Sequence, residues 1–94
     1  MLLPDIMGLR PLFDDHCRRL AEVTGATVCA VELWPDHLDA PLEWRLEHVG
    51  DLDPVRTLAD LSAAADATGA PRVGVLGFCM GGMITMQAAD TGRF

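Results

Sequence analysis

The sequence has 94 residues, which leaves room for one domain at most. Half of the residues are hydrophobic and 22% are charged, a composition typical of a globular core rather than of a disordered segment. The sequence has seven arginines, no lysine and fourteen acidic residues. The resulting net charge of -7 argues against nucleic acid as a partner, because its phosphates would be repelled.

Four further classes of protein are disfavoured: membrane-spanning, secreted, disulfide-stabilised and zinc-thiolate proteins. No apolar run approaches the roughly 18 residues of a membrane span, and the N-terminus lacks the basic flank and apolar stretch of a secretory signal. We therefore expect a cytoplasmic protein with no membrane partner. Cys17, Cys29 and Cys79 are odd in number and widely spaced, which argues against a disulfide framework and a thiolate zinc site. No metal or cofactor is expected.

The first half of the chain predicts a strand end, a helix and a second strand. Residues 1–3 are long enough only for the end of a strand. Residues 11–23 place apolar side chains on one face and charged ones on the other, which predicts an amphipathic helix with Pro11 in its first turn and Gly25 after its end. Residues 27–33 form a short β-branched and apolar run, which predicts a buried strand.

The second half predicts two more helices around one strand. Residues 35–53 are polar and irregular, and we expect a long loop with room for one helical turn. Asp53 and Pro54 are typical of an N-cap and first helical residue, and the helix they begin should end at Gly69. Residues 73–78 predict a parallel strand covered on both faces, followed by a helix over residues 80–90 with Gly92 as its cap. This alternation predicts an α/β fold with a parallel sheet and flanking helices.

Cys79 is the strongest candidate for chemistry. It lies where the predicted strand meets the last helix, between Gly77 and Gly81, in the G-x-nucleophile-x-G pattern of a nucleophile elbow. The sharp turn strains the backbone of the nucleophile, glycines on either side avoid clashes with it, and Gly82 permits close packing. The helix N-terminus should favour the thiolate of Cys79, and the N–H of Met80 should serve as an oxyanion-hole donor.

Other interpretations of the glycine cluster are weaker. The spacing does not fit a dinucleotide fingerprint, and the Lys of a phosphate loop is absent. A buried inert cysteine and a thiol redox sensor remain as alternatives, although no resolving cysteine lies near Cys79 in sequence.

The segments GFCMGG, at residues 77–82, and PDIMGL, at residues 4–9, resemble the dienelactone hydrolase family of α/β-hydrolases, which uses a Cys-Asp-His triad. The resemblance implies that Cys79 is the nucleophile, with the N–H groups of Ile6 and Met80 as the oxyanion hole. It also implies that Asp5 stands where the family usually has a Glu that contacts the thiol. Because Asp is one methylene shorter, capping of the following turn is the alternative role of Asp5.

The rest of the triad is missing from the sequence. In this fold the acid and then the His follow the nucleophile, yet no His follows Cys79. Asp90 would lie roughly 16 Å away along the same helix, so it is not the acid. We therefore expect residues 1–94 to be a single incomplete domain, a partial α/β-hydrolase fold truncated before the acid and His, from the N-terminal and middle part of the family fold.

No catalytic role is assigned to the remaining polar and aromatic residues. His16 is placed on the first helix, and His37 and His48 in the long loop. Arginines bind substrate carboxylates in the family, but neither Arg45 nor Arg56 aligns closely enough to be assigned that role. The sequence also predicts core packing for Cys17 and Cys29, and loop packing or pocket walls for Trp34 and Trp44.

By this resemblance the protein is expected to be a cysteine-dependent hydrolase of small-molecule esters or lactones, similar to carboxymethylenebutenolidases, that works through a thioester. The 94-residue chain alone should be weakly active or inactive. The alternative is a non-catalytic truncated domain that self-associates through open sheet edges. The sequence does not identify the substrate.

Overall fold

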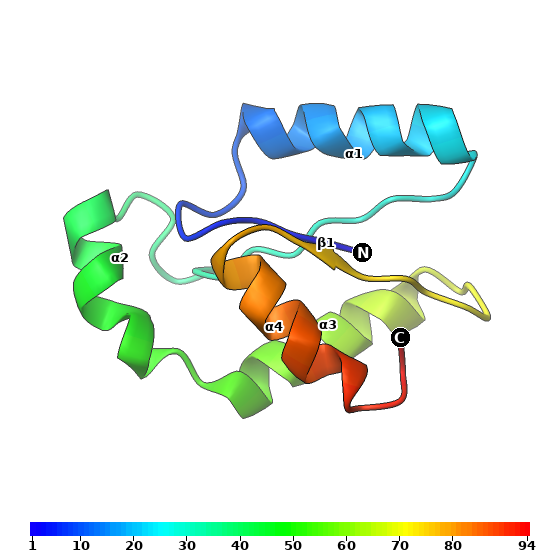
Figure 1. The fold of residues 1–94 in the computed structure, drawn as a ribbon. Helices are drawn as coiled ribbons and strands as arrows, with labels where there is room; N and C mark the ends of the chain where they lie inside the picture. Colours follow the sequence, from blue (N-terminus) through cyan, green and yellow to red (C-terminus); the bar gives the residue numbers. More distant parts are fainter.

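The computed structural model describes all of residues 1–94. Its elements, in chain order, are β1 (Leu2–Leu3), α1 (Pro11–Thr24), α2 (Leu42–His48), a 3-10 turn (Val49–Asp51), α3 (Pro54–Ala67), β2 (Leu76–Gly77) and α4 (Met80–Ala89). Figure 1 shows α1 on one side of the strands and α3 and α4 on the other. The layered arrangement agrees with the predicted α/β class.

The sheet is smaller than the sequence predicts. β1 pairs in parallel with β2, and Leu2 lies opposite Leu76. The strand predicted over residues 27–33 is wrong: that segment makes only a single parallel bridge, from Ala30 to Leu2. Likewise, the strand predicted over residues 73–78 is reduced to β2. Both segments are limited by their shared partner, because β1 is two residues long and Pro4 has no N–H to extend the ladder.

The long helices agree closely with the predictions. α1 ends one residue later than predicted, at Thr24, and Gly25 follows with φ +70°. The Asp53 carboxylate accepts hydrogen bonds from the N–H groups of Val55 and Arg56, which confirms the predicted cap of α3. α4 ends one residue earlier than predicted.

The loop predicted over residues 35–53 is only partly correct, since it contains α2 and the 3-10 turn. The sequence of α2, LEWRLEH, has no Gly or Pro and is rich in good helix formers. The helix is also held from outside, because the side chain of Arg45 is buried against neighbouring loops.

The main core lies between the strands and the helices α3 and α4. It joins side chains from β1, from the segment after residue 30 and from these two helices: Leu3, Leu33, Trp34, Leu61, Met80, Ile84 and Ala88. The outer face of α4 is left open, with Met83 at 66% and Met86 at 76% exposure. No helix in the structure is both long enough and apolar enough to cross a bilayer.

Candidate active site at the turn between β2 and α4

Cys79 lies on the sharp turn between β2 and α4. Its backbone has φ 51° and ψ −112°, and it is the one non-glycine residue with a positive φ. Holding an L-residue in such a conformation costs on the order of 1 to 3 kcal/mol, which the surrounding structure must supply. The strained turn predicted from the glycine spacing is therefore present, and the thiol at its apex is exposed.

Two glycines make this turn possible. A Cβ on Gly81 would meet the carbonyl oxygen of Pro4 and lie 2.6 Å from that of Leu3. A Cβ on Gly77 would meet the backbone of Gly81 and the hydroxyl of Thr85. Gly82 is less crowded, since its nearest contact would be 3.4 Å away. Gly77 and Gly81 thus permit the close approach of α4 to both strands.

Hydrogen bonds tie the turn to the loop that follows β1. The N–H of Phe78 donates to the carbonyl of Leu3 at 3.1 Å, and the N–H of Gly81 donates to that of Pro4 at 3.1 Å. Ile6 lies two residues farther along this loop. Its N–H and that of Met80 have no acceptor within the protein, so both predicted oxyanion-hole donors are free to bind a ligand.

Asp5 has partners other than the thiol. Its carboxylate accepts the N–H of Met7 at 3.0 Å and forms a two-pronged ion pair with Arg10 at 2.7 and 2.8 Å. The hydrogen bond from Arg10 is the main reason why the pKa of Asp5 lies below its ordinary value. No hydrogen bond joins Asp5 to Cys79, so the expected contact with the thiol is not made in this structure. The alternative role, capping the turn, describes the contacts that are present.

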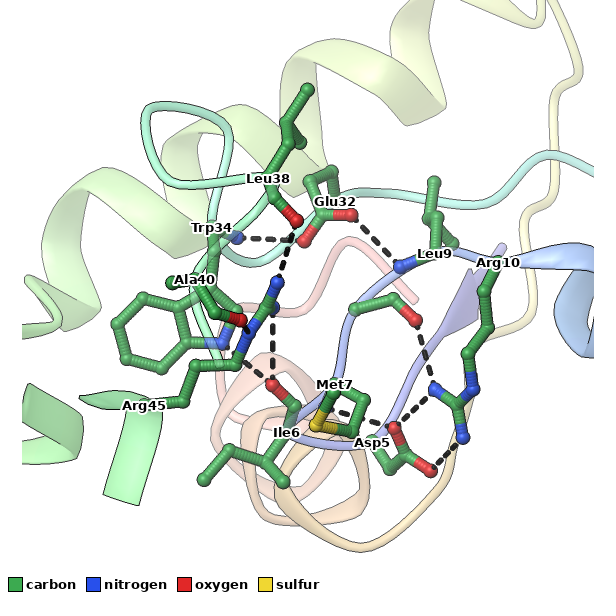
Figure 2. A network of polar contacts seen from close by, with 11 residues as sticks. Asp5, Ile6, Met7, Leu9, Arg10, Glu32, Trp34, Leu38, Ala40 and Arg45 are labelled. Atoms are coloured by element: carbon green, nitrogen blue, oxygen red, sulfur yellow. Dashed lines mark hydrogen bonds and ion pairs between the residues drawn. The ribbon is translucent and has the colours of Figure 1, made fainter. Parts of the chain in front are cut away.

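Arg45 is not free to bind a substrate carboxylate. It is 3% exposed, and its guanidinium donates to the carbonyls of Ala40 and Leu38, both at 2.8 Å, and more weakly to those of Ile6 and His37. Figure 2 shows the contacts with Ala40, Leu38 and Ile6. The sequence gives no signal for this role, because Arg45 lies in a polar segment that resembles a solvated loop.

Arg56 remains exposed and reaches Asp36 at 3.5 Å and Asp60 at 3.9 Å. It lines a cavity of about 240 Å³ together with Trp34 and Trp44, which agrees with the prediction of pocket walls for the two tryptophans. Cys79 lines none of the four main cavities.

The three histidines pack against aromatic rings. The ring of His16 stacks on that of Phe78 at 5.3 Å, whereas the rings of His37 and His48 flank Trp44. None of them makes a hydrogen bond with Cys79, and His48 instead bonds the carbonyl of Trp44. The structure therefore brings together Cys79, the loop of Ile6 and the N-terminus of α4, but no general base.

A comparison with protein families matches residues 1–94 to the dienelactone hydrolase family. The chain belongs to this family. The dienelactone hydrolase family is one of α/β-hydrolases, so membership supports a hydrolase with a small-molecule substrate. Comparisons with curated proteins and with solved structures gave no match.

Proposed function

We propose that the protein is a hydrolase of small-molecule esters or lactones in which Cys79 is the nucleophile. The observation that carries the proposal is the exposed Cys79 at a strained strand-to-helix turn in a dienelactone hydrolase family member. Such turns present a nucleophile at the end of a sheet, beside the N–H groups of the following helix.

The chemistry has two steps. The thiolate of Cys79 attacks the carbonyl carbon, a C–S bond forms, and the carbonyl electron pair moves onto oxygen. The free N–H groups of Met80 and Ile6 donate to this oxyanion. Its collapse breaks the C–O bond and expels an alkoxide or, from a lactone, opens the ring. Water then hydrolyses the thioester and regenerates the thiol.

The second step should be slow in the 94-residue chain. Hydrolysis of the thioester needs a base to activate water, and no histidine makes a hydrogen bond with Cys79. We therefore expect the chain to acylate once and then turn over weakly or not at all.

A burst experiment tests this function. With excess p-nitrophenyl acetate, the wild type should release close to one equivalent of p-nitrophenolate rapidly, followed by little further release. The Cys79→Ala variant should lose the burst, whereas Cys17→Ala, which removes a different thiol, should keep it. A burst that persists in Cys79→Ala would refute the assignment of the nucleophile.

A second candidate function is non-catalytic self-association through the sheet edge. β2 pairs only with β1, and Leu76 within it is 43% exposed. An open strand edge beside an exposed apolar side chain favours association with another chain. Light scattering after size exclusion tests this candidate: a dimer that Leu76→Arg converts to a monomer would support it, and a monomeric wild type would contradict it.

A further inference from the structure

The peptide unit between Ile6 and Met7 is held at both of its polar atoms. The indole Nε1–H of Trp34 donates to the carbonyl of Ile6 at 2.9 Å, and Arg45 donates to the same oxygen at 3.3 Å. The N–H of Met7, at the other side of this peptide, donates to the Asp5 carboxylate at 3.0 Å. Figure 2 shows Trp34 and Arg45 converging on the carbonyl of Ile6.

The groups that hold this peptide are themselves fixed. The side chain of Trp34 is 4% exposed, and its backbone N–H donates to Glu32 at 2.8 Å. The Arg45 guanidinium is locked by the carbonyls described above, and Asp5 is held by Arg10. The second carboxylate oxygen of Glu32 accepts the N–H of Leu9 at 2.8 Å, which closes the far end of the loop.

The near end of the loop is fixed to the turn that carries Cys79. The carbonyls of Leu3 and Pro4 accept hydrogen bonds from Phe78 and Gly81, so the backbone is anchored on both sides of Ile6. Between these anchors, the carbonyl of Asp5 accepts the N–H of Gly8 at 2.9 Å, and the N–H of Ile6, which belongs to the same peptide as that carbonyl, is left without an acceptor. A donor held in this way keeps one direction, and it needs no reorganisation when negative charge develops nearby.

We infer that Trp34 and Arg45 are positioning residues: by clamping the Ile6 carbonyl, they hold the Ile6 N–H in place as an oxyanion donor for Cys79. The inference rests on the proposed function. Neither residue touches the substrate; both act through the backbone of the Ile6 loop.

Two reactions of the same thiol separate this role from a purely structural one. Acylation by p-nitrophenyl acetate places negative charge on a carbonyl oxygen as the C–S bond forms and p-nitrophenolate leaves. Alkylation by iodoacetamide forms a C–S bond and expels iodide, with no charge on an oxygen that needs the donor. The ratio of the two rates at Cys79 therefore reports oxyanion stabilisation independently of thiol reactivity.

The variant Trp34→Phe removes the N–H and keeps an aromatic ring. We expect it to lower the acylation rate of Cys79 about tenfold, less than the 100- to 1000-fold loss typical of removing a donor outright. The alkylation rate should change less than about twofold, since that reaction forms no oxyanion and needs no donor for one. Trp44→Phe is the matched control, because the indole N–H of Trp44 makes no hydrogen bond, and it should leave both rates unchanged.

Arg45→Met should act in the same direction as Trp34→Phe, and Arg45→Lys should restore part of the acylation rate. Arg56→Met, at an exposed arginine, is the control. A two-dimensional amide NMR spectrum of each variant establishes whether it is folded. If Arg45→Met does not fold, the rates of Trp34→Phe alone test the positioning role. The positioning role alone would be overturned if folded Trp34→Phe were acylated as fast as the wild type. It would also be overturned if the acylation and alkylation rates of Trp34→Phe fell by the same factor. A wild type that is alkylated but never acylated at Cys79 would instead overturn the proposed function.

Discussion

The crowding around Gly81 allows a sharp test of how the turn is built. In Gly81→Ala, the new Cβ would lie 2.6 Å from the carbonyl oxygen of Leu3 and closer still to that of Pro4. Both are backbone atoms of buried residues, so they cannot move aside as the end of a flexible side chain would. Either α4 must move away from β1 or the strand must shift.

The expected cost follows from these contacts. Overpacking of a tight site costs about 1 to 3 kcal/mol, and loss of the hydrogen bond from Gly81 to Pro4 adds about 1 kcal/mol. The better helix propensity of Ala returns up to about 1 kcal/mol, which leaves a net loss of about 1 to 3 kcal/mol. Since each kcal/mol shifts the Tm of a domain this size by about 4 to 8 °C, we expect a decrease of roughly 4 to 24 °C.

Gly82→Ala is the matched control. It lies next to Gly81 in the same helix, but its Cβ would come no closer than 3.4 Å to Gly77. We expect its Tm to equal or slightly exceed that of the wild type, because Ala is the better helix former. Thermal unfolding followed by circular dichroism measures all three proteins. Equal Tm values for Gly81→Ala and Gly82→Ala would refute the argument that the approach of α4 to β1 requires a glycine.

Three further predictions concern single interactions. Asp53→Ala removes the cap of α3 and should lower the free energy of unfolding by about 1 kcal/mol in urea titrations, whereas Asp51→Ala, at an uncapped exposed position, should have little effect. Arg10 depresses the pKa of Asp5, so the ion pair stabilises the fold above the ordinary carboxyl value of 3.8 and this stabilisation is lost as the pH falls through the depressed pKa. Asp5→Asn should therefore be less stable than the wild type at pH 7, by up to about 1 kcal/mol, with a gap that closes below pH 3.8; a gap that widens in acid would contradict this. Cys79→Gly relieves the positive φ and should raise stability by about 1 kcal/mol while it abolishes acylation; a stability loss would show that the turn is not strained.

The parts of the fold that could be predicted depend on local signals. Pro11 and Gly25 bound α1, and the cap at Asp53 begins α3, so these helices are found from a few neighbouring residues. The predicted strands are longer than the observed ones, because the length of a strand depends on the strand with which it pairs. A short β1 that runs into Pro4 offers few backbone groups to pair with, whatever the β propensity of residues 27–33 or 73–78.

The candidate site likewise has a part that local sequence predicts and a part that depends on contacts between distant residues. The strained backbone of Cys79 follows from glycines two residues away on either side, and the sequence shows it directly. The contacts of Ile6 with Trp34 and Arg45 span 28 and 39 residues, and no periodicity or motif points to them. They arise only when the long loop and α2 pack against the loop that follows β1. The pairing of Asp5 with Arg10 is equally a matter of loop geometry rather than of pattern.

The most direct test of the central claim is to locate the acyl group. The wild-type chain would be treated with p-nitrophenyl acetate, quenched in acid and digested, and its peptides would be analysed by mass spectrometry. We predict one acetyl thioester on the peptide that contains Cys79, and none on those that contain Cys17 or Cys29. Acetylation spread over all three cysteines, or a Cys79 that iodoacetamide alkylates but the ester leaves unmodified, would contradict its role as the nucleophile.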